Sequence, residues 1–75
     1  MRENYRQIIG MNIKHFREAN NMTMEKLAFS AEISKTGLCY IERGVSDPRL
    51  STLEKIAKGM NIDLIALLEH KSSKK

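Results

Sequence analysis

Apolar residues in this chain recur at the three- and four-residue spacing of an α-helix, and they nowhere alternate with the period of two that marks a half-buried strand. The helical spacing recurs in five short segments, which polar or turn-forming residues separate. A chain of 75 residues has room for one small domain. The sequence therefore predicts an all-α fold, a compact five-helix bundle whose short helices share one thin core.

Residues that commonly cap helices set the expected boundaries of the five segments. The first helix is expected over about Tyr5 to Asn20, and the fourth starts with the capping-box pattern of Ser51 to Glu54. A glycine is expected just beyond the end of the third helix, where a left-handed residue can close it. The other expected caps are Thr23 and Ser34 at the starts of the second and third helices, Gly44 at the end of the third and Asp63 at the start of the fifth.

The second and third predicted helices are joined by about three residues around Glu32 and Ile33. Ala28 and Ala31 face inward on the second helix, and their small side chains would let the two helices cross closely. A link this short between two short helices predicts a helix-turn-helix arrangement. Many all-helical domains contain two short helices joined in this way, so the pattern alone predicts the arrangement of the helices and not a function.

Longer runs of the sequence resemble the phage repressor and Cro family of helix-turn-helix proteins, which includes xenobiotic-response-element-like regulators. The most specific run is IERG at 41–44 followed by PRLSTLEKIAK at 48–58, and similar runs lie at 9–17, 22–28 and 33–36. The resemblance implies a lambda-repressor-like domain over residues 1–70 that binds double-stranded DNA, usually as a homodimer on a palindromic operator. Residues 71–75 would form a basic flexible tail. The implied function is transcriptional regulation, as a Cro-like repressor or a restriction–modification controller protein.

The resemblance places the third helix, about Ser34–Arg43, in the major groove and implies roles for its outward side chains. Base contacts are expected from Lys35 and Thr36 at its start and from Tyr40 one turn later. Gly37 would remove a side chain where DNA approaches closely, although a glycine that is merely tolerated is the alternative. The expected contacts with the DNA backbone are Thr23, Arg43, Ser46, Arg49 and Ser51.

An ion pair between Arg17 on the first helix and Glu42 near the end of the third is also implied by the resemblance. A helical wheel agrees, because Glu42 lies nearer the Leu38 and Ile41 side of its helix than the outward side. A carboxylate on the inner side of a helix needs a partner that offsets the loss of water. We therefore expect a structural ion pair between the two helices.

Two features depart from the family's pattern. Met24 stands where the family often has a glutamine that contacts a phosphate and braces the third helix. The loop after the third helix is often basic, whereas here it reads Val45-Ser46-Asp47. With a net charge of only +4, these features predict fewer phosphate contacts and a weaker nonspecific attraction to DNA.

The fifth predicted helix is apolar nearly all round, and a short helix at the edge of a small domain cannot bury every side. A second copy of the chain is the simplest cover for the excess apolar surface. The predicted dimer interface is therefore Leu64, Ile65 and Leu68. The alternative is a protein-interaction module, such as an antitoxin or adaptor, that uses this helix to hold a different partner.

The remaining residues give little sign of other chemistry. No nucleophile–base pair, metal-ligand cluster or phosphate-binding glycine loop is recognisable, so no enzyme activity, metal, cofactor or small-molecule ligand is expected. His15 and His70 are interpreted as surface residues, and the single Cys39 as an inert residue of a cytoplasmic protein rather than a redox switch. No segment approaches the length of a membrane span. Phe29 has no firm explanation, and packing beneath the segment at Tyr5 is the expectation.

Overall fold

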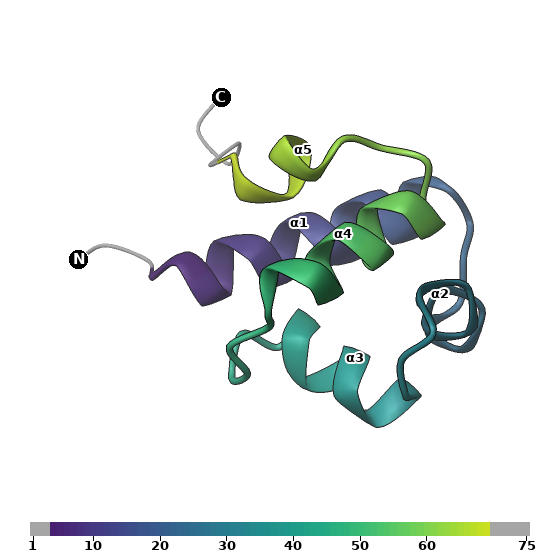
Figure 1. Ribbon diagram of the computed structural model, residues 1–75, viewed down its shortest axis with the longest axis horizontal. Coiled ribbons are helices and arrows are strands. Elements are labelled where there is room, and N and C mark those ends of the chain that lie inside the picture. Colours follow the sequence, from purple (N-terminus) through teal and green to yellow (C-terminus); the bar gives the residue numbers. More distant parts are fainter. Residues whose placement is uncertain (1–3, 70–75) are drawn as a thin grey trace.

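A computed structural model describes residues 4–69 of the chain and shows five helices in that range. The predicted all-α, five-helix fold is confirmed, and no strand occurs between residues 4 and 69. The basic tail expected at 71–75 and the surface position expected for His70 lie outside the described residues. The helices are α1 (Tyr5–Ala19), α2 (Met24–Ala31), α3 (Lys35–Glu42), α4 (Leu50–Gly59) and α5 (Leu64–Leu68) (Figure 1).

The core lies where the five helices meet, and each helix contributes one large side chain that is fully buried. α1 packs on α3 and α5, α2 packs on α3 and α4, and α4 packs on α5. α3 and α5 lie on opposite sides of the molecule (Figure 1), so surfaces on these two helices face different surroundings. These five large side chains are Ile13, Leu27, Leu38, Ile56 and Leu67, in the order of the helices.

Side-chain caps start three of the helices. The side-chain oxygen of Asn4 accepts a hydrogen bond from the Gln7 amide at 3.0 Å, and α1 follows. Thr23 Oγ1 accepts from the Lys26 amide at 3.0 Å, and Ser34 Oγ accepts from the Gly37 amide at 2.9 Å. The starts predicted for the second and third helices are therefore confirmed, because the local hydroxyl chemistry decides them.

The predicted start of the fourth helix is wrong. α4 begins at Leu50 with Arg49 in the N-cap position, and no side chain caps its first amides. Ser51 therefore lies inside the first turn instead of in front of it. Arg49, Leu50 and Ser51 are exposed, so water or a ligand can satisfy the free amides and a side-chain cap is not required. Asp63 occupies the N-cap position of α5 as expected, without a side-chain cap bond.

Gly44 ends α3 as predicted, in a left-handed conformation with a φ of 78°. Its amide donates to the Ile41 carbonyl at 3.1 Å, and the Val45 amide donates to the Tyr40 carbonyl at 3.2 Å. This pair of bonds is the Schellman arrangement, which satisfies two carbonyls that the helix leaves free. α3 therefore has a firm end on the side of the following loop.

α1 and α3 cross closely at Gly10, a buried residue on α1. A Cβ atom at this position would stand 2.5 Å from the Ile41 carbonyl oxygen and 2.6 Å from that of Glu42. Both neighbours are backbone atoms, which cannot rotate away as a side chain can. The crossing of the two helices therefore depends on the missing side chain.

Phe29 does not pack beneath the segment at Tyr5, so that expectation is wrong. The Phe29 side chain is 85% exposed on α2, because Leu27, Ala28 and Ala31 already fill the buried face of that helix. The Tyr5 hydroxyl instead donates a hydrogen bond to Asp47 Oδ1 at 3.1 Å. Among the helices described, none has the length and apolar character that crossing a bilayer requires.

Candidate nucleic-acid interface

α3 divides into an inner and an outer face. Leu38 and Ile41 are buried in the core on the inner face. Thr36 and Arg43 are exposed on the outer face, and Tyr40 is 48% exposed. The core already holds the inner face in place, so the outer side chains are available to a ligand.

The outer face of α3 borders an open hollow of about 370 Å³, which we call the α3 hollow. It brings together all three predicted base contacts with one of the predicted backbone contacts. Met24 at the first turn of α2 forms part of the wall, so the hollow spans the two helices of the helix-turn-helix. Its lining residues are Met24, Lys35, Thr36, Cys39, Tyr40 and Arg43.

Lys35 forms an ion pair with Glu25 across the two helices, with its Nζ atom 3.1 Å from Glu25 Oε2. Both side chains are more than half exposed. The hydrogen bond from Lys35 and its positive charge lower the pKa of the Glu25 carboxyl below its ordinary value, so the carboxylate is charged at neutral pH. Sequence reasoning missed this contact, because it depends on the angle at which α2 meets α3.

Gly37 lies in the first turn of α3 and is half-buried. A Cβ atom there would stand 3.1 Å from Ser34 Oγ, the hydroxyl that caps the helix, and no other neighbour lies within 4 Å. The glycine therefore leaves room for the cap hydroxyl. The rest of the space around it is open, and the expectation that a ligand comes close to the backbone here remains a proposal.

Arg17 and Glu42 meet in a bidentate ion pair that joins α1 to the end of α3. Arg17 Nε donates to Glu42 Oε2 at 2.7 Å, and Nη2 donates to Oε1 at 3.1 Å. Arg17 Nη1 also donates to the Met22 carbonyl at 2.8 Å, next to the start of α2. The hydrogen bond that Arg17 donates to Glu42 raises the pKa of Arg17, and the Glu42 side chain is only 2% exposed. One guanidinium therefore ties α3, α1 and the segment before α2 together.

The other predicted backbone contacts lie outside the α3 hollow. Thr23 caps α2 with its hydroxyl oxygen, and Ser46 is half-buried in the loop before α4. Arg49 and Ser51 are exposed at the start of α4, where the uncapped amides of the first turn are also free of side-chain partners. The structure therefore places these four residues at the starts of α2 and α4 and in one loop.

Asp47 ties the loop between α3 and α4 to the first turn of α1. It accepts the hydrogen bond from Tyr5, and its Oδ2 lies 3.7 Å from Arg6 Nη2. All three side chains are exposed. The loop whose lack of basic residues predicts fewer phosphate contacts is therefore also held against α1.

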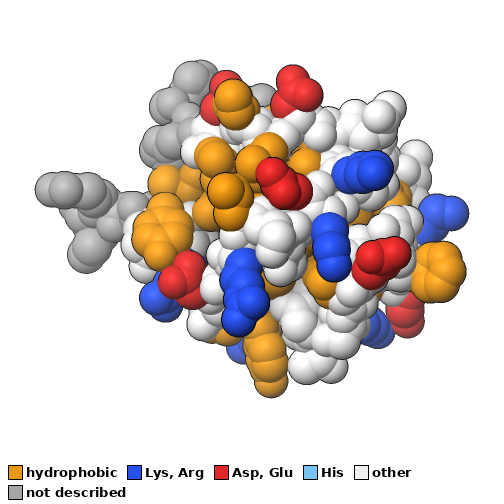
Figure 2. All heavy atoms as spheres, viewed as in Figure 1, with side chains coloured by type: hydrophobic (Ala, Val, Ile, Leu, Met, Phe, Trp, Pro, Cys, Tyr) orange, Lys and Arg blue, Asp and Glu red, His pale blue; other side chains and the backbone are white. Residues whose placement is uncertain are grey.

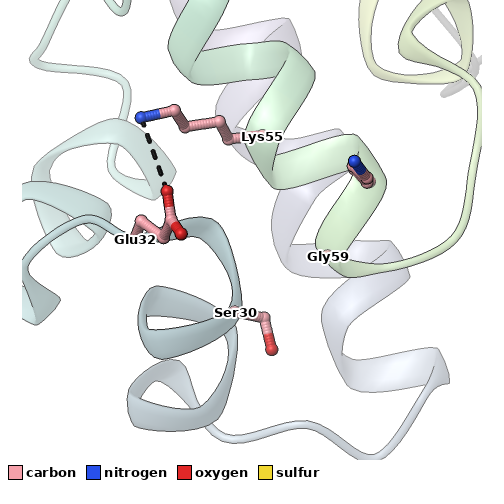
Figure 3. A pocket seen from close by; sticks show the side chains of 5 residues that line it. Ser30, Glu32, Lys55 and Gly59 are labelled. Atoms are coloured by element: carbon pink, nitrogen blue, oxygen red, sulfur yellow. Dashed lines mark ion pairs between the residues drawn. The ribbon is translucent and has the colours of Figure 1, made fainter.

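A second hollow, again of about 370 Å³, lies between α2 and α4 (Figure 3). Lys58 and Gly59 line it, and an exposed ion pair between Lys55 and Glu32 crosses it at 3.9 Å. An exposed pair of this kind contributes little to stability. A Cβ atom at Gly59 would stand 3.2 Å from Ser30 Cβ, so the helices approach closely at this point. We interpret this hollow as a seam between two packed helices.

Hydrophobic side chains gather on the molecular surface over α5 (Figure 2). Ile65 is 65% exposed and Leu68 is 45% exposed, whereas Leu67 is fully buried against the core. Leu64 is partly buried against the same core. Two of the three residues predicted for a dimer interface thus present apolar surface outward, and Leu64 lies partly beneath it.

The histidine and cysteine residues form no metal site within residues 4–69, where no group of three or more potential ligands comes together. His15 is exposed and its ring lies edge-on to Phe16, with ring centroids 5.4 Å apart. Cys39 is half-buried in the wall of the α3 hollow.

Comparison with known proteins gives relatives over most of the chain. Control protein C.BamHI of Bacillus amyloliquefaciens is 34% identical over 70 residues, which cover 92% of this chain and 86% of that protein. The immunity repressor protein of Bacillus phage phi105 is 37% identical over 60 residues, which cover 80% of this chain and 42% of the repressor. The chain thus spans most of the control protein and less than half of the phage repressor.

A solved structure of SinR, a master regulator for biofilm formation, in complex with DNA has the same fold. The two chains superpose with a TM-score of 0.77 at 31% identity, over 81% of this chain and 98% of that one. SinR of Bacillus subtilis is also a sequence relative, 31% identical over 65 residues that cover 85% of this chain and 59% of SinR.

Residues 13–67 match the family model described as helix-turn-helix. The matched range contains α2, the three-residue link and α3 in full, together with α4. These matches confirm the resemblance to phage repressors and related regulators. The chain belongs to the helix-turn-helix family.

Proposed function

We propose that this protein is a sequence-specific DNA-binding regulator of transcription that acts in the cytoplasm, with α3 as its recognition helix. One observation carries the proposal: the outer face of α3 presents Lys35, Thr36, Tyr40 and Arg43 around a single open hollow. Two apolar side chains and a buried ion pair hold the inner face rigidly. A recognition helix in the major groove needs both properties, because base edges are read by side chains in fixed positions.

The proposed contacts divide into two classes. Lys35, Thr36 and Tyr40 read base edges, and Gly37 lets the start of α3 come close to the DNA. Thr23, Arg43, Ser46, Arg49 and Ser51 contact the sugar-phosphate backbone and set the register of the protein on the duplex. The uncapped amides at the start of α4 support this division, since free amides at a helix N-terminus bind phosphate.

The relatives support the same function. Their names include a control protein and an immunity repressor, and the solved structure of SinR contains DNA. We propose a regulator of the Cro-like repressor or restriction–modification controller type, without enzymatic activity and without a cofactor. A palindromic operator follows if the protein binds as a two-fold dimer.

A dimer through α5 is the second part of the proposal, and Ile65→Glu is expected to break it. A carboxylate at a buried apolar contact loses its water without gaining a partner, so the dissociation constant should rise at least about tenfold. Sedimentation velocity over a range of concentrations measures this change. A wild type that stays monomeric, or an Ile65→Glu protein that dimerises as tightly as the wild type, would contradict the dimer.

Phe29→Glu is the matched control for the dimer experiment. It also replaces an exposed apolar residue by glutamate, but on α2, and should leave the dimer unchanged. The alternative function, an antitoxin or adaptor that uses α5 to hold another protein, rests on the same exposed Ile65 and Leu68. A monomeric wild type that binds no DNA would favour that alternative.

Selection of bound duplexes from a randomised DNA library tests the proposed function directly. The wild type should enrich one motif whose two halves are related by a two-fold axis. Thr36→Glu is the control, because a carboxylate in the first turn of α3 suits the helix dipole but repels phosphates. This variant should stay folded and enrich no sequence. A wild type that enriches no sequence at low salt would overturn the proposed function.

A further inference from the structure

The ion pair between Glu25 and Lys35 places an acidic group at the edge of the proposed DNA-binding surface. Lys35 lines the α3 hollow, and Glu25 holds its Nζ atom at 3.1 Å from the neighbouring helix. Exposed pairs of this kind add little to the stability of a fold. The contact therefore has no strong structural purpose, although it fixes the position of one side chain that is proposed to read DNA.

A free lysine at this position would strengthen binding to every DNA sequence. Its charge would neutralise a phosphate and release a counterion at any position on the DNA, whatever the sequence. Lys35 and Glu25 together carry no net charge. The gain in affinity for random-sequence DNA is therefore largely lost. Arg43, at the other end of the hollow, has no acidic partner within residues 4–69 and keeps its attraction to phosphate.

The paired lysine can still recognise a guanine. A lysine ammonium has three N–H donors, of which one is engaged by Glu25 and two remain. Guanine presents two acceptors in the major groove, O6 and N7. The carboxylate also offsets the unfavourable position of a cation at the positive N-terminus of α3. Glu25 thus orients the Lys35 ammonium so that its two remaining N–H donors can reach a guanine.

We propose that Glu25 is a specificity-determining positioning residue, which acts through Lys35 to favour a guanine in the operator and to weaken binding to all other DNA. This inference rests on the proposed function. It assigns a role to a residue outside the set of predicted DNA contacts, and it explains why an acidic side chain is tolerated beside a polyanion.

Glu25→Gln tests the proposal, since the amide keeps the shape of the side chain and removes the charge. Its affinity for random-sequence duplex should rise about fivefold near physiological salt, and the slope of log affinity against log salt should steepen by about 1. Its affinity for the selected operator should rise less or fall. The ratio of operator to random-sequence affinity should therefore drop, and the selected guanine should be less strongly preferred.

Two further variants separate this role from a general effect of charge. Glu54→Gln removes the same charge from the exposed side of α4, and should change the operator and random-sequence affinities by one common factor. Glu25→Gln in a Lys35→Ala background should not lower the ratio further, because Glu25 acts through Lys35. The role of Glu25 would be overturned if Glu25→Gln changed the operator and random-sequence affinities equally. It would also be overturned if Glu25→Gln lowered the ratio of the two affinities as much in the Lys35→Ala background as in the wild type. Either result would leave the proposed function standing. A wild type without any sequence preference would overturn this role together with the proposed function.

Discussion

Replacing Gly10 by alanine is expected to lower the free energy of unfolding by about 3 kcal/mol or more, a large share of the roughly 5–10 kcal/mol that a domain of this size has in total. The added Cβ atom would stand 2.5 and 2.6 Å from two backbone carbonyl oxygens of α3. Neither oxygen can move without displacing the helix, and α3 carries both the core contacts and the proposed recognition surface. Urea unfolding followed by circular dichroism measures the change.

Gly37→Ala is the matched control for the same substitution in a different helix. Its Cβ atom would meet only Ser34 Oγ, at 3.1 Å, and alanine favours a helix interior by about 1 kcal/mol over glycine. The two effects oppose each other, so we expect a change within about 1 kcal/mol. A Gly10→Ala protein as stable as Gly37→Ala would show that α1 and α3 do not cross as closely as described.

Arg17→Met is expected to cost about 3–5 kcal/mol of the free energy of unfolding, because it leaves the carboxylate of Glu42 buried without its partner. The Glu42 side chain is 2% exposed and depends on both bonds from the guanidinium. Arg6→Met is the control on the same helix: Arg6 pairs with Asp47 at the exposed surface, and its loss should cost less than about 1 kcal/mol.

A double-mutant cycle with Arg17→Met and Glu42→Leu gives the sharper result. Two apolar side chains can pack where the ion pair was, so the double variant should recover part of the stability that Arg17→Met loses. The coupling energy should exceed about 1 kcal/mol. Additive losses would mean that the two side chains do not stabilise each other, and that another contact holds α3 against α1.

The sequence was sufficient for features that local chemistry decides. The hydroxyls of Thr23 and Ser34 cap the helices that were expected to follow them, and Gly44 adopts the left-handed conformation that ends α3. The same kind of reasoning was wrong at Ser51, where the capping box predicted a start two residues later than the one observed. The exposed amides at the start of α4 do not need a side-chain partner, so the pattern had no structural role there.

Features that depend on the angle between helices could not be predicted from the sequence. Nothing near Gly10 in the sequence shows that its neighbour in space is the backbone of α3. The contact between Glu25 and Lys35 likewise follows from the way α2 meets α3. The exposure of Phe29 could not be predicted either, because other residues already fill the buried face of α2.

Separate selections from randomised DNA with four alanine variants test most directly whether the outer face of α3 reads bases. Lys35→Ala, Thr36→Ala and Tyr40→Ala should each relax the preference at one base pair per half-site, with losses of roughly 1–3 kcal/mol in operator affinity. Arg43→Ala should weaken all sequences about equally, since its side chain at the end of α3 is expected to contact the backbone. If the first three variants bind more weakly but select the same sequence as the wild type, α3 does not read bases and is not a recognition helix.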